Sequence, residues 1–421
     1  MSELKHYETD ILTTAYAKPD AYGSLAMPVY YTAAYEFPSA KAMSDAFCGR
    51  SMEHSYSRIS NPTVQHLERR VRHFTGALSV TALNTGMAAI NNTLIAVAKQ
   101  GTNIVTSAHL FGNTYSFLHT TLAQFGVEVR DADLTDLEAT ERLMDENTCA
   151  LFLEIITNPQ MEVADLGALS ELAHRHSVPV IADTTIVPFT VFHAKDFGVD
   201  IEVISSTKYI SGGATGLGGL IIDYGTFDWS TSPNINLAWR SKRIGDKVAF
   251  SARLKTEILT NMGALMTPQV AYMQNLGLET LQLRFQRQAS SALWLARQLQ
   301  NVEDIKNVNY TGLEDNPYFE ISRRQFGDLP GAMLTIDLAD KGQCYRFMDA
   351  LKVIRRATNL FDNKSLAIHP SSTIFGLFND VQKQAMDVRD TTVRLSIGLE
   401  DKEDLLADIV QAVKASQVEN V

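Results

Sequence analysis

Between residues 78 and 222, short apolar runs alternate with stretches in which apolar residues recur every three or four positions. A short unbroken apolar run is typical of a strand buried on both faces, and the longer spacing is typical of a helix with one apolar side. The runs predict strands at 79–83, 103–107, 127–131, 150–156, 178–183, 201–205 and 218–222. The spaced stretches predict helices at 87–98, 114–125, 136–144 and 166–174. We therefore expect an α/β fold with a mostly parallel, seven-stranded sheet flanked by helices.

The chain before this alternation has a different pattern. Residues 1–60 hold half of the 14 tyrosines but show only weak periodicity. An irregular aromatic segment of this kind packs on a surface, which is either its own domain or a partner subunit. A helix should follow it, since Asn61 or Ser60 can cap a helix start, Pro62 suits the first turn and Gly76 can end it. We expect an N-terminal arm at 1–60.

The chain after the alternation predicts a second, smaller domain. Residues 224–260 are polar and are expected to be irregular, and apolar periodicity at 266–299 predicts one or two linking helices. Strands are expected at 332–338 and 392–397, and helices at 343–351 and 403–413. The expected organisation is an α/β domain at 61–260, followed by a linking helix and a C-terminal α+β domain at 261–421.

Composition narrows the possible partners and surroundings. The net charge of -11 argues against nucleic acid or an anionic membrane as a partner, because both require a basic surface. The three cysteines are far apart and form no metal-binding or disulfide pattern, so we expect a reducing compartment and no metal site. The first residues lack a basic segment followed by an apolar core, and no apolar run reaches the length of a membrane span. We expect a cytoplasmic protein.

Polar residues stand where several predicted strands end. Thr85 and Gly86 come between the first strand and its helix, Asp183 ends another strand, and Lys208 follows a third. A helix start can hold a phosphate, a buried carboxylate needs a cation, and a lysine removed from water can attack a carbonyl. A lone lysine is more often a surface residue, but the combination suits pyridoxal 5'-phosphate (PLP). Lys208 would bind this cofactor covalently, and Asp183 would keep its ring nitrogen protonated.

Five motifs add a family resemblance. They are Tyr-Ser-Arg-Ile-Ser-Asn-Pro-Thr at 56–63, Thr-Gly-Met-Ala-Ala at 85–89, Glu-Ile-Ile-Thr-Asn-Pro at 154–159, Ser-Ser-Thr-Lys-Tyr at 205–209 and Val-Arg-Leu-Ser-Ile-Gly-Leu-Glu-Asp at 393–401. In this combination the chain resembles the Cys/Met-metabolism PLP-dependent enzymes, the cystathionine γ-synthase-like group of fold type I. The resemblance covers nearly the whole chain, from about residue 13 to 413.

The resemblance implies a role for each matched residue. Tyr56 and Arg58 would reach the cofactor phosphate from a neighbouring subunit, with Tyr56 also taking part in catalysis, so a dimer would be the smallest active unit and would pair into a tetramer. The cofactor would be bound by Thr85, Gly86, Met87, Phe111, Asn158, Asp183, Ser205, Thr207 and Lys208. Arg394, with Ser365 nearby, would bind the substrate carboxylate, which suits a two-pronged guanidinium.

Within the family, residues 359–373 resemble the O-acetylhomoserine sulfhydrylases most. Four positions depart from the family pattern. Phe111 stands where a tyrosine is usual, Thr184 where an asparagine follows the aspartate, Ile204 where a histidine is common, and Phe375 near a histidine of the sulfhydrylases. Phe111 can still stack on the cofactor ring, but it lacks a hydroxyl that family mechanisms use as an acid or base. His109 or Tyr115 could replace that group.

The resemblance implies γ-replacement on O-acetylhomoserine with sulfide or a small thiol, giving homocysteine or methionine. Cystathionine γ-synthase and methionine or cystathionine γ-lyase are alternatives. Which activity results depends on whether a thiol or water reaches the reaction intermediate. The family's methionine γ-lyases usually have cysteine where Asn113 stands, which disfavours that activity. A non-catalytic PLP-binding protein is a further alternative, but it would not need Lys208, Asp183 and Arg394 together.

Overall fold

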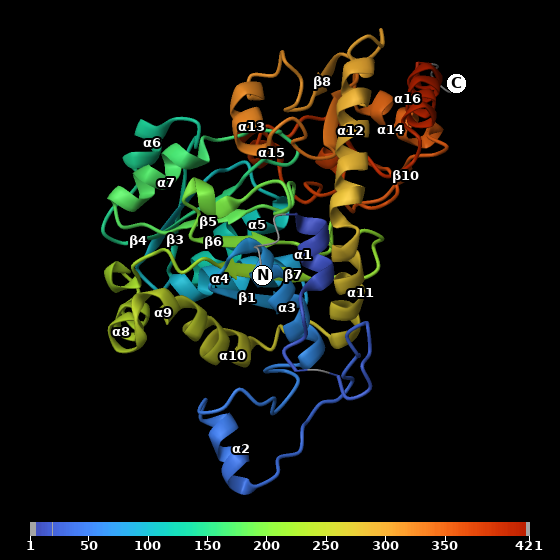
Figure 1. Cartoon of the computed structure of the whole chain (residues 1–421). Coiled ribbons are helices and arrows are strands. Elements are labelled where there is room, and N and C mark those ends of the chain that lie inside the picture. The colour runs from blue at the N-terminus through green and yellow to red at the C-terminus, as the bar shows by residue number, and fades with distance from the viewer. Residues whose placement is uncertain (1–5, 19, 418–421) are drawn as a thin grey trace.

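The computed structural model describes residues 6–18 and 20–417. No helix in these two ranges combines the length and the apolar character that crossing a membrane requires. Figure 1 shows a large α/β body, a smaller part with the C-terminal strands, and an N-terminal segment of which the part around α2 (Ala40–Phe47) projects away from both.

The large body is built on a seven-stranded sheet in the order β1-β7-β6-β5-β4-β2-β3. Strand β7 runs antiparallel to both of its neighbours, and the other paired strands are parallel, so the predicted mostly parallel sheet is confirmed. The predicted strand positions agree to within about two residues. The strands are β1 Ser79–Leu83, β2 Asn103–Thr106, β3 Glu128–Asp131, β4 Thr148–Glu154, β5 Val180–Asp183, β6 Ile201–Ile204 and β7 Gly219–Asp223.

Helices cover both faces of this sheet, because its strands are apolar on both sides. One face packs against α3 and α7, and the other packs against α4. The helices of this region are α3 Pro62–Thr75, α4 Gly86–Val97, α5 Gly112–Ser116, α6 Leu137–Glu141 and α7 Leu166–Arg175. As predicted, Asn61 caps α3 and Gly76 ends it in a left-handed conformation. A π-helical turn, Phe117–Leu122, continues α5, and short 3-10 helices lie at Ala123–Phe125 and Ala194–Phe197.

The prediction that residues 224–260 are irregular is wrong. They form a 3-10 turn at Trp229–Thr231, helices α8 Ile235–Ile244 and α9 Asp246–Arg253, and a π-helical turn at Leu254–Leu259, followed by α10 Thr260–Met262. Helix α8 is only 10 residues long and buries only Leu237 and Ser241, so its apolar positions form too short a pattern to predict a helix. Packing against neighbouring helices stabilises this region instead.

Two helices link the large sheet to the C-terminal part. They are α11 Pro268–Glu279 and α12 Leu281–Leu299, and α12 extends from the large body to the top of the molecule in Figure 1. The second sheet has the order β10-β11-β12-β9-β8. Its strands are β8 Asn307–Asn309, β9 Met333–Asp337, β10 Arg355–Arg356, β11 Leu366–Ile368 and β12 Thr392–Ser396. The helices of this part are α13 Phe319–Phe326, α14 Lys341–Ala350, α15 Asp380–Ala385 and α16 Lys402–Ser416, with a 3-10 turn at Pro370–Ser372.

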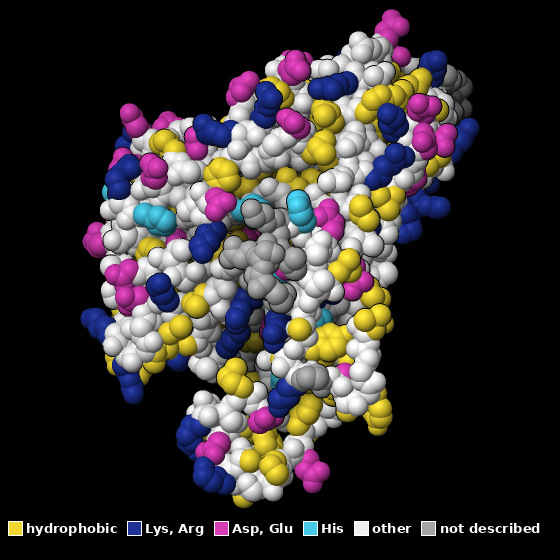
Figure 2. Space-filling view, viewed as in Figure 1, with side chains coloured by type: hydrophobic (Ala, Val, Ile, Leu, Met, Phe, Trp, Pro, Cys, Tyr) yellow, Lys and Arg dark blue, Asp and Glu magenta, His cyan; other side chains and the backbone are white. Residues whose placement is uncertain are grey.

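The N-terminal segment has two short helices, α1 Tyr7–Thr13 and α2 Ala40–Phe47, within otherwise irregular chain. Helix α1 packs on α3 and α11, whereas α2 projects at the bottom of Figure 1. Large apolar side chains are exposed along this segment, among them Tyr22, Leu25, Tyr31 and Met52. Figure 2 shows acidic and basic side chains interspersed over one face of the molecule, with apolar side chains on the projecting part.

Candidate active site

A cavity of about 570 Å³ lies at the carboxyl ends of the parallel strands of the large sheet. This is the edge at which α/β sheets bind ligands, because the loops and helix starts there leave polar groups free. The C-terminal part closes the cavity from the other side, through Arg394 of β12 and loop residues such as Thr358. Ten of the predicted site residues line it: Thr85, Gly86, Met87, Phe111, Asn158, Asp183, Ser205, Thr207, Lys208 and Arg394.

The start of α4 provides one end of this cavity. The Thr85 side chain caps the helix by accepting a hydrogen bond of 2.9 Å from the Ala88 N–H. The N–H groups of Gly86 and Met87 fall in the first turn, where no helical carbonyl can accept them. A Cβ atom at Gly86 would lie 2.6 Å from the Cβ of Ser205, so only glycine permits this close approach. Free N–H groups beside a serine hydroxyl suit a phosphate group.

Asp183 lies at the end of β5, beside Glu154 at the end of β4. Burial raises the pKa of Asp183, while hydrogen bonding from Thr185 and the positive charge of Lys208 oppose that rise. The Thr185 N–H donates to the Asp183 carboxylate at 2.9 Å. Because little positive charge lies near this buried carboxylate, it is suited to bind a cationic ligand atom, such as the protonated ring nitrogen of PLP.

Lys208 lies just beyond β6, with its Nζ donating a 2.9 Å hydrogen bond to the Asn359 side-chain oxygen. Burial, followed by the positive charge of Arg394, lowers the pKa of Lys208 to about 8, and the negative charge of Asp183 limits the shift. An appreciable fraction of the amine is therefore neutral near pH 7–8, and a neutral amine is the form that reacts with an aldehyde.

Arg394 lies in β12 of the small sheet and is 2% exposed. Its Nη1 donates to Asn158 at 3.1 Å and its Nη2 to the Asn359 carbonyl at 3.4 Å, while Nε has no partner. Within residues 6–18 and 20–417, no acidic side chain forms an ion pair with it, and burial lowers its pKa to about 9. A buried guanidinium without a counterion is suited to an anionic ligand such as a carboxylate.

Several residues of the cavity were not singled out from the sequence. Glu154 accepts a hydrogen bond of 2.6 Å from the Phe111 N–H, and burial, then the charge of Asp183, raises its pKa well above the ordinary value. Glu154 is the first residue of the matched Glu-Ile-Ile-Thr-Asn-Pro motif, and Asn359 is the first residue of the segment that resembles the sulfhydrylases. Both residues could therefore have been predicted from these motifs. Leu360, Thr373 and Ile374, from the loops that connect the strands of the small sheet, also line the cavity, and only the fold places them there.

The structure does not bring Ser365 into this cavity. Ser365 is fully buried, its hydroxyl donates to Glu400 at 2.8 Å, and the same oxygen accepts from the Gly398 N–H at 2.8 Å. Its hydrogen-bonding capacity is used within the C-terminal part of the structure.

Tyr56 and Arg58 are also absent from the cavity lining. They lie on the N-terminal segment, where the Arg58 guanidinium is 5.6 Å from the Tyr56 ring centroid. The Arg58 Nη1 donates to the Thr260 carbonyl at 2.5 Å.

Neither suggested replacement for the missing tyrosine hydroxyl lines the cavity. His109 pairs with Glu162 at 2.5 Å, and this pairing raises the pKa of His109. The Tyr115 ring stacks on His119 with centroids 4.1 Å apart. Phe111 itself lines the cavity, so a tyrosine hydroxyl at this position, as is usual in the family, would lie at the site.

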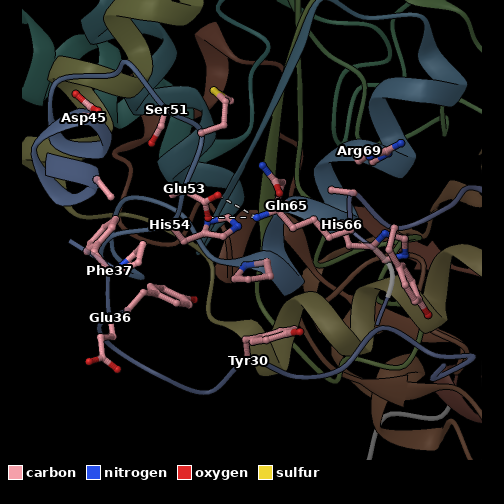
Figure 3. A pocket seen from close by; sticks show the side chains of 18 of the residues that line it. Tyr30, Glu36, Phe37, Asp45, Ser51, Glu53, His54, Gln65, His66 and Arg69 are labelled. Atoms are coloured by element: carbon pink, nitrogen blue, oxygen red, sulfur yellow. Dashed lines mark hydrogen bonds and ion pairs between the residues drawn. The ribbon is translucent and has the colours of Figure 1, made fainter. Parts of the chain in front are cut away.

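A second cavity, of about 730 Å³, opens between the N-terminal segment and α3. Figure 3 shows His54, Glu53 and Phe37 of the segment on one side, and Gln65, His66 and Arg69 of α3 on the other. It lies outside the strand ends and contains none of the predicted cofactor residues.

Comparisons with known proteins agree with this geometry. Residues 8–414 match the model of a protein family described as Cys/Met metabolism PLP-dependent enzyme. The chain is 32% identical to O-acetyl-L-homoserine sulfhydrylase of Corynebacterium glutamicum over 91% of both proteins, and 33% identical to L-methionine gamma-lyase of Pseudomonas putida over 99% of both. A crystal structure of a putative O-acetylhomoserine (thiol)-lyase from Campylobacter jejuni, with a pyridoxyl-lysine phosphate, superposes with a TM-score of 0.92 at 32% identity, covering 97% of this chain and 100% of that one.

Proposed function

This chain belongs to the Cys/Met metabolism PLP-dependent enzymes, and from that premise we propose that it catalyses γ-replacement on O-acetylhomoserine. The acceptor in this proposal is sulfide or a small thiol, and the product is homocysteine or methionine. The chain is a PLP-dependent enzyme of sulfur amino-acid metabolism, and the proposal concerns which reaction it catalyses.

The cofactor, when bound, supplies an electron-withdrawing ring that stabilises negative charge on the carbons of a bound amino acid. In our proposal Gly86, Met87, Ser205 and Thr207 hold its phosphate at the start of α4. Asp183 balances the charge of the ring nitrogen, and Phe111 packs on the ring. These residues all line one cavity at the edge of the large sheet. Together they are suited to bind a phosphate, a cationic ring nitrogen and the face of an aromatic ring.

Lys208 has two roles in the proposal. Its amine binds the cofactor covalently, and once substrate has displaced it, the free Nζ takes the proton from the substrate α-carbon and then helps to move a β-proton. The pKa of about 8 supports both roles, because the neutral amine is a nucleophile and its conjugate acid is a moderate proton donor. Asn359, which accepts from Nζ at 2.9 Å, orients the amine.

The main observation in support of an amino-acid substrate is that the positive charge of Arg394 has no counterion among the described residues. This guanidinium lines the same cavity as Lys208, is almost completely buried and has an unused Nε. An α-carboxylate could accept two parallel hydrogen bonds from it, and a substrate held there would direct its α-carbon toward the cofactor side of the cavity. An amino acid therefore fits better than a substrate without a carboxylate.

The choice of O-acetylhomoserine rests on likeness to the sulfhydrylases and on segment 359–373. A γ-lyase is the second candidate, because the Pseudomonas putida lyase is similarly identical to this chain. Asn113, which lines the cavity, stands where the family's methionine γ-lyases usually have a cysteine, and this favours the transferase.

Product analysis with O-acetylhomoserine tests the proposal. With sulfide we expect homocysteine and acetate as the main products, whereas without a thiol we expect slow turnover. Rapid release of ammonia and a 2-oxo acid regardless of sulfide would identify a lyase. Lys208→Ala is the control for background chemistry, and absence of both reactions in cofactor-loaded protein would support a non-catalytic role.

We also propose that the active unit is at least a dimer, in which Tyr56 and Arg58 of one subunit approach the cofactor phosphate of the other. The support is indirect but physical. Both residues lie outside the cavity of their own chain, and the segment that carries them exposes large apolar side chains. A second copy packed against this segment would cover those side chains and the cavity of Figure 3.

A further inference from the structure

A carboxylate with no assigned role lies inside the large sheet, next to the candidate site. Glu202, in the middle of β6, has an exposed fraction of 0%. Its Oε1 accepts a hydrogen bond of 2.5 Å from the Thr184 hydroxyl, and its Oε2 accepts one of 2.5 Å from the Tyr224 hydroxyl. Such short contacts are typical of hydroxyls that donate to a charged carboxylate.

Glu202 is on the opposite face of the sheet from the Asp183 side chain. In the β5–β6 register Glu202 pairs with Ala182, and Asp183 pairs with Val203, so neighbouring positions face opposite sides. Burial raises the pKa of Glu202 to about 7, while the hydrogen bonds from Thr184 and Tyr224 favour its charged form. Burying a carboxylate in the core of a sheet costs free energy of folding, and the hydrogen bonds from the two hydroxyls offset that cost.

Thr184 connects this buried carboxylate to the site. It stands between Asp183 and Thr185, and both of these line the active-site cavity. The Thr185 N–H donates to Asp183, and the Thr185 hydroxyl accepts from the Ser205 N–H at 2.8 Å. These bonds hold the turn from 183 to 185 on the cavity side. On the other side the Thr184 hydroxyl is bonded to Glu202, and the Thr184 N–H donates to the Val203 carbonyl at 3.1 Å.

We propose that Glu202 is a positioning residue, which holds the turn from Asp183 to Thr185 through the Thr184 hydroxyl and thereby fixes the Asp183 carboxylate against the ring nitrogen of the cofactor. The inference rests on the role proposed for Asp183. Tyr224 does not belong to this turn, since it follows β7 and its hydroxyl contacts only the other oxygen of Glu202.

The two hydroxyls provide a matched pair of variants. Thr184→Val and Tyr224→Phe each remove one hydrogen bond to Glu202 with little change in side-chain volume, but only the first releases the turn. We would strip the purified protein of cofactor, titrate it with PLP, and measure both Kd and the visible circular dichroism of the bound cofactor. The dichroism reports the tilt of the ring and does not require turnover.

Thr184→Val should weaken cofactor binding about tenfold or more, the size typical of losing an outer-layer hydrogen bond, and should reduce the visible dichroism. Thr184→Ser, which keeps the hydroxyl, should restore both. Tyr224→Phe should lower the melting temperature as Thr184→Val does but leave Kd and dichroism unchanged.

Equal effects of Thr184→Val and Tyr224→Phe on Kd would reject the proposal, because Glu202 would then contribute only to the stability of the sheet. Unchanged binding in both variants would reject it as well. Asp183→Asn separates the proposal from its premise. If Asp183→Asn weakens binding and Thr184→Val does not, only the positioning role fails. If Asp183→Asn binds normally, the role of Asp183 fails and the positioning role fails with it.

Discussion

The reactivity of Lys208 depends on how deeply its amine is buried beside another cation. Burial and the charge of Arg394 lower its pKa to about 8, and Asp183 limits the shift. In water the same amine would be almost fully protonated at neutral pH. The fold thus prepares this residue to react before any ligand arrives.

We predict that covalent loading of PLP onto cofactor-free protein accelerates with pH and reaches half of its maximal rate near pH 8. The reason is that only the neutral Lys208 amine attacks the aldehyde, and its fraction rises as pH passes the pKa. Stopped-flow absorbance over a pH series measures the rate. Arg394→Met removes a nearby positive charge, so it should move the midpoint to higher pH, and an unmoved midpoint would contradict the electrostatic cause.

Phe111 carries a second prediction at this scale. The side chain lines the cavity but cannot exchange a proton, and neither His109 nor Tyr115 takes its place there. Phe111→Tyr should therefore raise the rate of the chemical step by about 10²-fold, the lower end of what a positioned acid or base contributes. Single-turnover kinetics measure the effect.

Phe111→Leu is the control for this prediction, because it removes the aromatic ring and should weaken cofactor binding. If Phe111→Tyr turns over at the unmodified rate, the natural reaction does not need that proton. If Phe111→Leu binds cofactor normally, the ring does not stack on it.

Single residues also show what sequence can and cannot predict. Asp183, Lys208 and the residues at the start of α4 could be predicted, since strand ends of a parallel sheet meet at one edge. Ser365 was predicted near the substrate, but its hydroxyl is bound to Glu400. Which hydroxyl faces a cavity depends on side-chain packing, and no sequence pattern records it.

At the scale of elements, the start of α4 shows how a single atom shapes a binding site. The helix can approach Ser205, which directly follows β6, only because Gly86 has no Cβ. The close approach places free helix N–H groups beside the serine hydroxyl, and both are suited to the same phosphate.

We expect Gly86→Ala to weaken PLP binding by about tenfold or more, because the new Cβ would overlap Ser205 and overpacking of this kind costs about 1–3 kcal/mol. Equilibrium titration of cofactor-free protein measures the change. Gly167→Ala in α7 is the matched control, since its Cβ would have no neighbour closer than 3.7 Å. Equal weakening in both variants would show that the effect is general instability.

Elements differ in how well the sequence predicts them. The strands of the large sheet lie close to their predicted positions, because strands buried on both faces are apolar throughout. The sequence pattern does not predict helices α8 and α9, because they are short, half of their residues are polar, and their contacts with each other and with the rest of the body are tertiary. Local pattern cannot report a helix that is stabilised in this way.

At the scale of the whole molecule, the N-terminal segment is the feature that a single chain does not explain. Tyr22 and Leu25 are almost fully exposed, and α2 projects away from the body. Burial of such side chains is favourable, so this surface is suited to another copy of the chain.

We predict that two inactive variants restore activity when mixed. In a dimer of Arg58→Ala and Lys208→Ala subunits, one of the two sites has an intact lysine and an intact arginine from the other subunit. Random exchange makes half of the dimers hybrids, so activity should reach about a quarter of the unmodified value. Exchange is verified by native mass spectrometry. If hybrids form and no activity returns, Arg58 does not act across subunits.

The active-site cavity is divided between two sheets, and this division has a consequence for how the enzyme can diversify. Residues suited to the cofactor come from the strand ends of the large sheet, whereas Arg394 comes from β12 of the small sheet, and Leu360 and Ile374 come from the chain that connects its strands. Mutations in the small sheet can therefore alter which amino acid is accepted while leaving the cofactor chemistry intact. A laboratory exchange of residues 360–396 between relatives, which keeps Asn359 beside the Lys208 amine, would graft substrate preference as a module, and natural drift within that stretch offers the same route to new specificities.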